Sequence, residues 1–172
     1  MPGGNAMADE LRELHLRAAS EADLPLLLSL IRELADYERL SHLVAATEAT
    51  LRESLFGTHP GAEVVLGFEA DQPVGFAVYF HNFSTFLGVK GLWLEDLYVR
   101  PVYRRRGYGR VMLLHVARIA HKRGCGRFEW AALDWNEPAI RFYKSLGAVS
   151  LDDWTIFRVT GATLEKLANM SW

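Results

Sequence analysis

The segment Arg104–Arg110 reads RRRGYGR and combines arginines with two glycines at alternate positions. Glycines just before a helix expose successive backbone N–H groups, and the positive end of the helix dipole strengthens their attraction for an anion. The spacing therefore predicts an anion-binding loop. It is not a P-loop, because GxxxxGK[ST] is absent, and it lacks the third glycine of the dinucleotide fingerprint GxGxxG. In isolation such a loop is as often a solvated charge run. The strand-like run before it and the helical run after it favour an anion site.

Two acids, Glu95 and Asp96, interrupt a run of apolar residues that is otherwise typical of a strand. Alternation along a strand sends neighbouring side chains to opposite faces, unless a bulge changes which of them faces a site. Solvent exposure is the usual environment of such a pair, but acids in so apolar a strand are harder to explain as surface charge. Tyr143 shares a helical stripe with Phe142 and Leu146, so its spacing alone favours a core aromatic.

Hydrophobic periodicity sets these residues in a mixed α/β fold. It predicts strands at 14–19, 62–70, 73–80, 91–100, 128–133 and 154–159, and helices around 24–35, 47–55, 108–122, 137–146 and 164–168. Asn136 is expected to cap the helix that follows it, and His81–Gly88 is expected to be a loop. Three consecutive strands suit an antiparallel meander, and the strand–helix–strand from 91 to 133 suits a right-handed parallel crossover.

The composition suits a single globular domain, since half of the 172 residues are hydrophobic. We take residues 11–172 as that domain and set aside residues 1–10 as a disordered or cloning-derived N-terminus. One cysteine excludes an internal disulfide, and no histidine pair has metal-site spacing, so no metal is expected. The net charge of −2 gives no general case for nucleic acid. No apolar run has the length of a membrane span, and a cytoplasmic location is expected.

Several spaced motifs together resemble the GNAT acetyltransferases, and more narrowly their spermidine/spermine (diamine) and thialysine N-acetyltransferase branch. Arg104-x-x-Gly107-x-Gly109 is similar to the pyrophosphate-binding motif of the family. The other matches are LIRELAxYE at 30–38, FGxxP at 56–60, LED at 94–96, DWNEP at 134–138 and FYKxxGA at 142–148. The resemblance implies a GNAT-like central sheet that is mostly antiparallel, with one parallel strand–helix–strand crossover and helices on both faces. It also implies acetyl-CoA as co-substrate.

Roles for single residues follow from the same resemblance. Tyr143 matches the general acid of the family, and Glu95 matches the acid that draws a proton from the amine, directly or through water. The implied cofactor-binding groups are the backbone of Leu97 and Val99, with Arg104, Arg105, Arg106, Gly107, Tyr108, Gly109, Arg110, Asn136 and Tyr143. The implied substrate-binding residues are Tyr37, Glu38, Ser84, Phe86, Glu95 and Asp96.

The reaction implied is transfer of an acetyl group to a primary amine of a small molecule, either a diamine or polyamine or a thialysine-like amino acid. Polyamine enzymes of the branch carry an acid where this chain has Ser84, which weakens the case for long polyamines. An acetyltransferase for protein lysines or N-termini is the alternative within the fold. Outside it stand a nucleic-acid-binding module that uses the arginine-rich loop, and a coenzyme A sensor without activity. A homodimer is expected by resemblance, whereas no nucleic-acid or membrane partner is expected.

Overall fold

The computed structural model describes residues 14–171, which divide into two units. The first runs through Ala131 and the second begins at Ala132, and each is described by itself. The segment 1–10, expected to be disordered or cloning-derived, lies outside the described residues. That residues 11–172 form a single domain stays a prediction.

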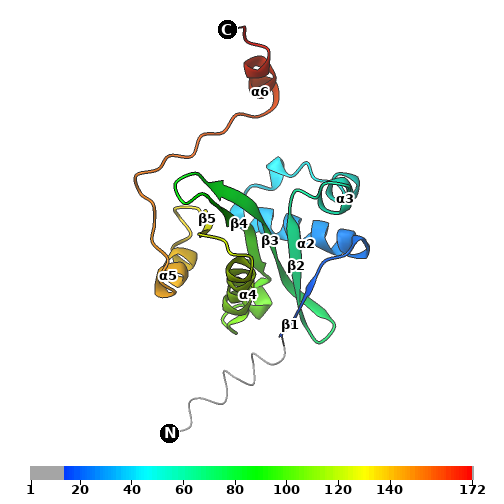
Figure 1. Cartoon of the computed structure of the whole chain (residues 1–172). Helices are drawn as coiled ribbons and strands as arrows, with labels where there is room; N and C mark the ends of the chain where they lie inside the picture. The colour runs from blue at the N-terminus through cyan, green and yellow to red at the C-terminus, as the bar shows by residue number, and fades with distance from the viewer. Residues whose placement is uncertain (1–13, 172) are drawn as a thin grey trace. The chain divides into compact units, whose positions relative to one another are not determined.

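The first unit is built on one five-stranded sheet (Figure 1). Its strands follow each other in sequence order: β1 (Leu14–Ala18), β2 (Glu63–Glu69), β3 (Gln72–Ser84), β4 (Val89–Val99) and β5 (Phe128–Trp130). Neighbours are antiparallel except β4 and β5, which are parallel and joined through a helix. The predicted meander and parallel crossover are therefore confirmed. The predicted loop at His81–Gly88 is partly wrong, because β3 and β4 stay paired as far as Ser84 and Val89.

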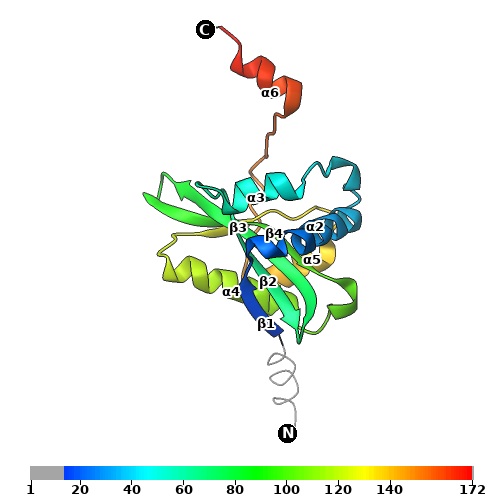
Figure 2. The same cartoon turned by 90° about the vertical axis from the view of Figure 1, so that its right-hand side faces the viewer.

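Helices cover both faces of this sheet, as predicted (Figures 1 and 2). On one face lie α2 (Leu24–Glu38) and α3 (Glu48–Phe56), and Leu27 and Leu30 of α2 pack against Leu66 and Phe76. On the other lies α4 (Tyr108–Lys122), whose Met112 lies over Gly67 of β2. Residues 66 and 67 are neighbours in β2 and therefore face opposite sides of the sheet, so residue 66 packs against α2 and residue 67 lies under α4. Short 3₁₀ turns occur at Glu21–Asp23, Ser41–Leu43 and Pro101–Tyr103.

The second unit contains α5 (Glu137–Ser145) and α6 (Gly161–Ala168). The Asn136 side chain accepts a hydrogen bond from the Ala139 N–H, so its predicted cap is confirmed. The predicted strand at 154–159 is wrong: these residues form neither helix nor strand, and Trp154 and Phe157 are exposed. Apolar alternation describes a chain that could enter a sheet, but a strand exists only where a neighbour takes its backbone hydrogen bonds. Within residues 14–171 no helix is long and apolar enough to cross a bilayer.

Candidate active site

A β-bulge lies at the paired acids of β4. Asp96 is opposite Val78 and Leu94 is opposite Tyr79 in the antiparallel pairing with β3, so Glu95 has no opposite residue. An extra residue shifts the alternation by one, and Asp96 therefore lies on the same face as Tyr98, toward α2. Sequence alternation alone left open which of the two acids would face a site. The bulge sets Asp96 against α2 and leaves Glu95 exposed beside it.

Asp96 is the centre of a group of three acids, Glu38, Glu95 and Asp96, which we call the acid cluster. Burial raises the pKa of Asp96 to about 6, and repulsion from Glu95 and then from Glu38 adds to the rise. Burial also raises the pKa of Glu38, at the end of α2. Three carboxyl groups that repel each other favour a cation or a proton among them. The predicted acids of the substrate site are thus brought together.

Trp93 holds the carboxylate of Glu95. Its indole Nε1 donates a hydrogen bond of 2.9 Å to Glu95 Oε2. The sequence-based prediction did not include Trp93, although residues two apart in a strand lie on one face and can meet. An indole can only donate, so this contact suits an ionised carboxylate and limits its orientation.

The edge of β4 opens at the two acids of this strand, Glu95 and Asp96. The pairing of β4 with β5 runs from Leu92 to Leu94 and ends there. The Arg100 N–H donates to the Val74 carbonyl at 2.9 Å and so faces β3. Because N–H groups alternate in direction along a strand, those of Leu97 and Val99 point away from β3, toward the open edge. These are the two backbone groups predicted to contact the cofactor.

The loop after β4 turns sharply into α4. Gly107, which precedes the first helical residue, has a φ of 82°, and Arg105 has a φ of 65°. The first hydrogen bond of α4 is from the Val111 N–H to the Gly107 carbonyl, at 3.0 Å. The N–H groups of residues 108–110 therefore have no acceptor within the helix and are available to an anion. Left-handed backbone at a residue other than glycine is a strained conformation of the kind that gathers at binding loops.

Gly109 leaves room for a ligand at this helix end. A Cβ built on Gly109 would meet only Val99 Cγ2, at 3.8 Å, an ordinary contact distance. Neither crowding nor a left-handed φ thus requires glycine here, unlike Gly107. Alanine would stabilise the helix more than glycine does, so helix stability does not explain Gly109. The free space above it is consistent with close approach of another molecule to the backbone.

The arginine and tyrosine side chains of the loop make contacts inside the protein. The Arg104 guanidinium lies 4.2 Å from the centre of the Tyr37 ring, and its Nε donates to the Val99 carbonyl at 2.9 Å. Arg106 forms an ion pair of 2.9 Å with Glu69, and the buried Tyr108 donates its hydroxyl to the same carboxylate. Arg105 and Arg110 are exposed. Any contribution of Tyr108 to an anion site is therefore through its backbone.

Two predicted substrate residues lie elsewhere in the chain. Ser84 and Phe86 are at the tip of the β3–β4 hairpin, where the Leu87 N–H donates to the buried Ser84 hydroxyl at 3.3 Å. Phe86 is 96% exposed. Six residues of β4 separate the tip from Glu95, roughly 20 Å at the rise of an extended strand. Within one chain, neither residue is near the acid cluster.

Tyr143 lies in the second unit, on α5. Its side chain is half-buried, and its ring centre is 5.2 Å from that of Phe142. Both features agree with the stripe seen in the sequence. The roles of Tyr143 as acid and of Asn136 as cofactor contact stay predictions.

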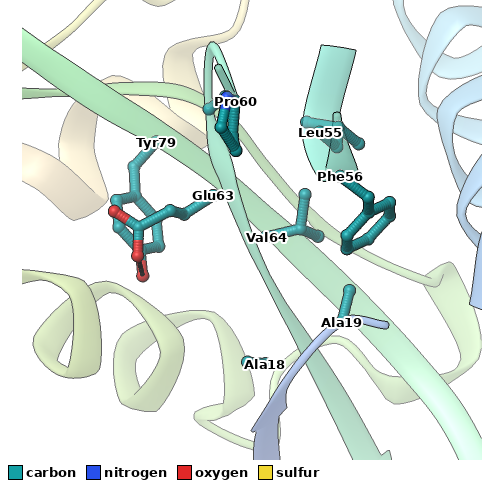
Figure 3. Close-up of a pocket in the computed structure, with 9 residues that line it drawn as sticks. Ala18, Ala19, Leu55, Phe56, Pro60, Glu63, Val64 and Tyr79 are labelled. Carbon is teal, nitrogen blue, oxygen red and sulfur yellow. Dashed lines mark hydrogen bonds between the residues drawn. The ribbon is translucent and has the colours of Figure 1, made fainter. Parts of the chain in front are cut away.

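A cavity of about 170 Å³ lies at the start of β2, away from the acid cluster (Figure 3). Leu55 and Phe56 of α3 border it on one side of β2 together with Val64, whereas Glu63 and Tyr79 point to the other side. Glu63 is held by an ion pair with Arg123 and by the Tyr79 hydroxyl. The cavity includes none of the predicted site residues. It is a gap at the sheet edge beside a paired acid, and we assign it no part in the chemistry.

Several known proteins resemble this chain over most of its length. Thialysine N-epsilon-acetyltransferase of Mus musculus is 38% identical over 164 residues, covering 89% of this chain and 96% of that protein. L-ornithine N5-acetyltransferase of Arabidopsis thaliana is 30% identical over 201 residues, covering 91% and 88%. Among solved structures, an integron cassette protein from the mobile metagenome of V. cholerae has a TM-score of 0.78 at 29% identity. It covers 92% of this chain and 99% of its own.

Residues 24–148 match the model of the acetyltransferase (GNAT) family. The matched range contains α2 with Glu38, the bulge of β4, the glycine loop, α4 and α5. The chain therefore belongs to the GNAT acetyltransferase family and is an acetyl-transferring enzyme.

Proposed function

We propose that this enzyme transfers the acetyl group of acetyl-CoA to a primary amine of a small molecule, either a diamine or polyamine or a thialysine-like amino acid. The observation that carries the proposal is the acid cluster, which adjoins the open edge of β4. Carboxylates attract an ammonium group, and Asp96 and Glu38 are buried enough to do so in a medium that screens charge less than water. The names of the mouse and Arabidopsis relatives also support an amine acceptor.

The residues of the open edge and the loop fit acetyl-CoA. Its pyrophosphate would take the N–H groups at the start of α4, with space above Gly109 for its approach. Its amide-containing arm would run along β4 and meet the N–H groups of Leu97 and Val99 as an added strand does. Arg105 and Arg110, both exposed, would add positive charge.

The reaction needs an amine without its extra proton, because an alkylammonium has a pKa of about 10.4 and no lone pair. We assign that proton transfer to Glu95, directly or through water. Asp96 and Glu38 are assigned to attract the ammonium form of the substrate into the site. Acetyl-CoA supplies the acetyl group as a thioester. The Leu97 N–H is assigned to the carbonyl oxygen, where negative charge develops. Tyr143 is assigned to protonate the departing sulfur, so that the new N–C bond forms as the C–S bond breaks.

A panel of amines tests this function, with release of free thiol from acetyl-CoA as the readout. The panel contains diamines, spermidine, ornithine, lysine, thialysine and a lysine peptide. We expect small amines with a second charged group to be the best acceptors, and Asp96→Asn to raise their KM. A preference for the lysine peptide, or an Asp96→Asn variant with unchanged KM, would contradict a small cationic acceptor held by the acid cluster.

The same assay separates two roles for Glu95. If Glu95 accepts the proton, Glu95→Gln lowers kcat at neutral pH, and the loss of kcat is smaller at high pH, where more of the amine is already neutral. If Glu95 only binds the substrate, Glu95→Gln raises KM and leaves kcat nearly unchanged across the pH range.

A further inference from the structure

Helix α2 contacts the end of β4 and the anion loop that follows it (Arg104–Arg110) at two points, one helical turn apart. The Glu33 carboxylate accepts two hydrogen bonds from Arg100, of 2.9 and 2.7 Å. Four residues later, the Tyr37 ring lies under the guanidinium of Arg104, 4.2 Å from its centre. Residues four apart share one helix face, so Glu33 and Tyr37 meet two arginines that are also four apart in the chain.

The same end of α2 reaches the acid cluster. Glu38 follows Tyr37 directly, and its charge raises the pKa of Asp96. Helix α2 then ends at Arg39, which has a left-handed φ of 62°. The last turn of α2 thus carries one residue that contacts the anion loop and, next to it, one that faces the amine site.

Arg104 has a second contact that ties it to the open edge of β4. Its Nε donates to the carbonyl of Val99, the residue whose N–H faces that edge. The guanidinium also lies 5.8 Å from the centre of the Tyr98 ring, which packs in the core below α2. One side chain therefore joins the strand end, the loop and α2. A ligand bound to the loop would therefore act on Arg104 and, through Tyr37, on the last turn of α2.

We propose that the stack of Arg104 on Tyr37 couples the two substrate sites, so that the amine binds more tightly once the anion loop is occupied. Tyr37 and Arg104 are then positioning residues: they act on the amine through Glu38 and Asp96. The proposal rests on the proposed function, because it takes the acid cluster as the amine site. The coupling can be no larger than the stack that carries it, which limits it to about 2- to 30-fold in amine affinity.

The test compares Tyr37→Leu, which removes the ring, with Tyr37→Phe, which keeps it, and with Arg104→Gln and the double variant Tyr37→Leu/Arg104→Gln. We expect Tyr37→Leu to raise the KM of the amine at saturating acetyl-CoA by about 3- to 10-fold with kcat within about twofold, because only positioning is lost. Tyr37→Phe, which keeps the ring, raises the KM less than Tyr37→Leu does. The double variant is no worse than the worse single variant, because both remove one contact. Arg17→Gln is the matched control for Arg104→Gln, since it removes a guanidinium that stacks on the Phe68 ring, at 4.7 Å, from the edge strand β1.

Calorimetry gives the coupling itself. Free coenzyme A should tighten amine binding to the wild-type protein and to Tyr37→Phe, and leave it unchanged in Tyr37→Leu. Equal amine affinity with and without coenzyme A in the wild-type protein would overturn the proposal, as would additive effects of the two single changes. The variant Asp96→Asn distinguishes a failure of the coupling proposal from a failure of the proposed function. If Asp96→Asn raises the amine KM and Tyr37→Leu does not, only the coupling is wrong. If neither does, the acid cluster is not the amine site.

Discussion

Asp96 is a buried acid whose ionised form lowers the stability of the folded protein. Its carboxyl lies between the sheet and α2, with two other acids near it and a pKa raised to about 6. In the unfolded chain an aspartate has a pKa of about 3.9, so the folded protein binds this proton more tightly. The contribution of the group to stability is therefore complete below pH 4 and is lost as the pH rises through 6. At neutral pH the enzyme keeps an unfavourable charge that a bound ammonium group would neutralise.

Asp96→Asn should consequently stabilise the free protein at high pH only. A shift of about two pKa units corresponds to up to about 3 kcal/mol in the free energy of unfolding at pH 8, and to little of it at pH 4.5. Urea denaturation at the two pH values measures the difference. Asp71→Asn, in the exposed turn between β2 and β3, is the control and should change neither value. Equal effects of Asp96→Asn at both pH values would mean that the charge of Asp96 is not destabilising.

Trp93 should matter only through Glu95. Trp93→Phe keeps an aromatic ring but removes the donor at Glu95 Oε2, so the carboxylate loses its fixed orientation. We expect kcat to fall by about 3- to 10-fold, in line with the roughly 1 kcal/mol that a typical hydrogen bond contributes. In a Glu95→Gln background the same change should have no further effect. An equal loss in both backgrounds would show that Trp93 acts independently of Glu95.

Tyr143 can be tested without disturbing its packing. Tyr143→Phe keeps the ring beside Phe142 and deletes only the hydroxyl. If the hydroxyl protonates the leaving sulfur, kcat falls by about 100-fold or more while the melting temperature stays near that of the wild type. Tyr103→Phe, in the turn after β4, provides the control. A Tyr143→Phe variant with normal kcat would return Tyr143 to the role of a packed aromatic.

At the scale of elements, the start of α4 carries two glycines with different physical reasons. Gly107 has a left-handed φ that other residues adopt only with strain. Gly109 is helical, and the space above it is open apart from Val99. The first glycine shapes the loop, and the second leaves the backbone accessible. The motif in the sequence does not distinguish these two reasons, but the dihedral angles do.

Alanine at the two positions should have opposite effects on stability. Gly109→Ala raises the free energy of unfolding by up to about 1 kcal/mol, since alanine is the better helix former, and weakens acetyl-CoA binding by obstructing its approach. Gly107→Ala lowers the free energy of unfolding by about 1–2 kcal/mol. Chemical denaturation and calorimetry with acetyl-CoA measure both. Undiminished affinity in a folded Gly109→Ala protein would mean that the ligand does not approach this helix end.

The helices, the strand order and the glycine-containing turn before α4 could be predicted from the sequence because local signals mark them. Asn136 caps α5 as its residue type suggests, and the glycines precede α4 as their spacing requires. The bulge at Glu95 could not be predicted from the sequence, because it depends on the register of β4 with β3. The same limit explains the wrong strand at 154–159: alternation is visible in a sequence, whereas the partner strand is not. The site contacts of Trp93 and Tyr37 were likewise unpredicted, since they depend on register and on how α2 packs.

For the whole molecule, the local distribution of charge is more informative than the net charge. The net charge of −2 is small, yet the first unit contains an acid cluster near one part of β4 and arginines on the loop after it. Under the proposed function, a cationic amine and an anionic co-substrate would be attracted to different parts of this one continuous segment.

Salt should accordingly weaken the use of both substrates. Screening reduces interactions of exposed charges beyond a Debye length of about 8 Å at physiological ionic strength. We expect kcat/KM for the amine to fall several-fold between low and high potassium chloride, and the slope to be smaller in Asp96→Asn. A neutral, non-ionisable osmolyte at matched osmolality serves as the control. An amine kcat/KM that does not respond to salt would argue against a cationic acceptor.

The open edge of β4 has a consequence for handling of the protein. Two N–H groups, of Leu97 and Val99, face an edge where pairing with β5 has ended. Unpaired strand edges are templates for other chains, and natural proteins commonly cover them or interrupt them with charge. If acetyl-CoA binds along this edge, as proposed, the edge must stay free, and the acids at its start would also deter a strand from another chain. The ligand that completes the sheet would then protect the enzyme from self-association during concentration and storage.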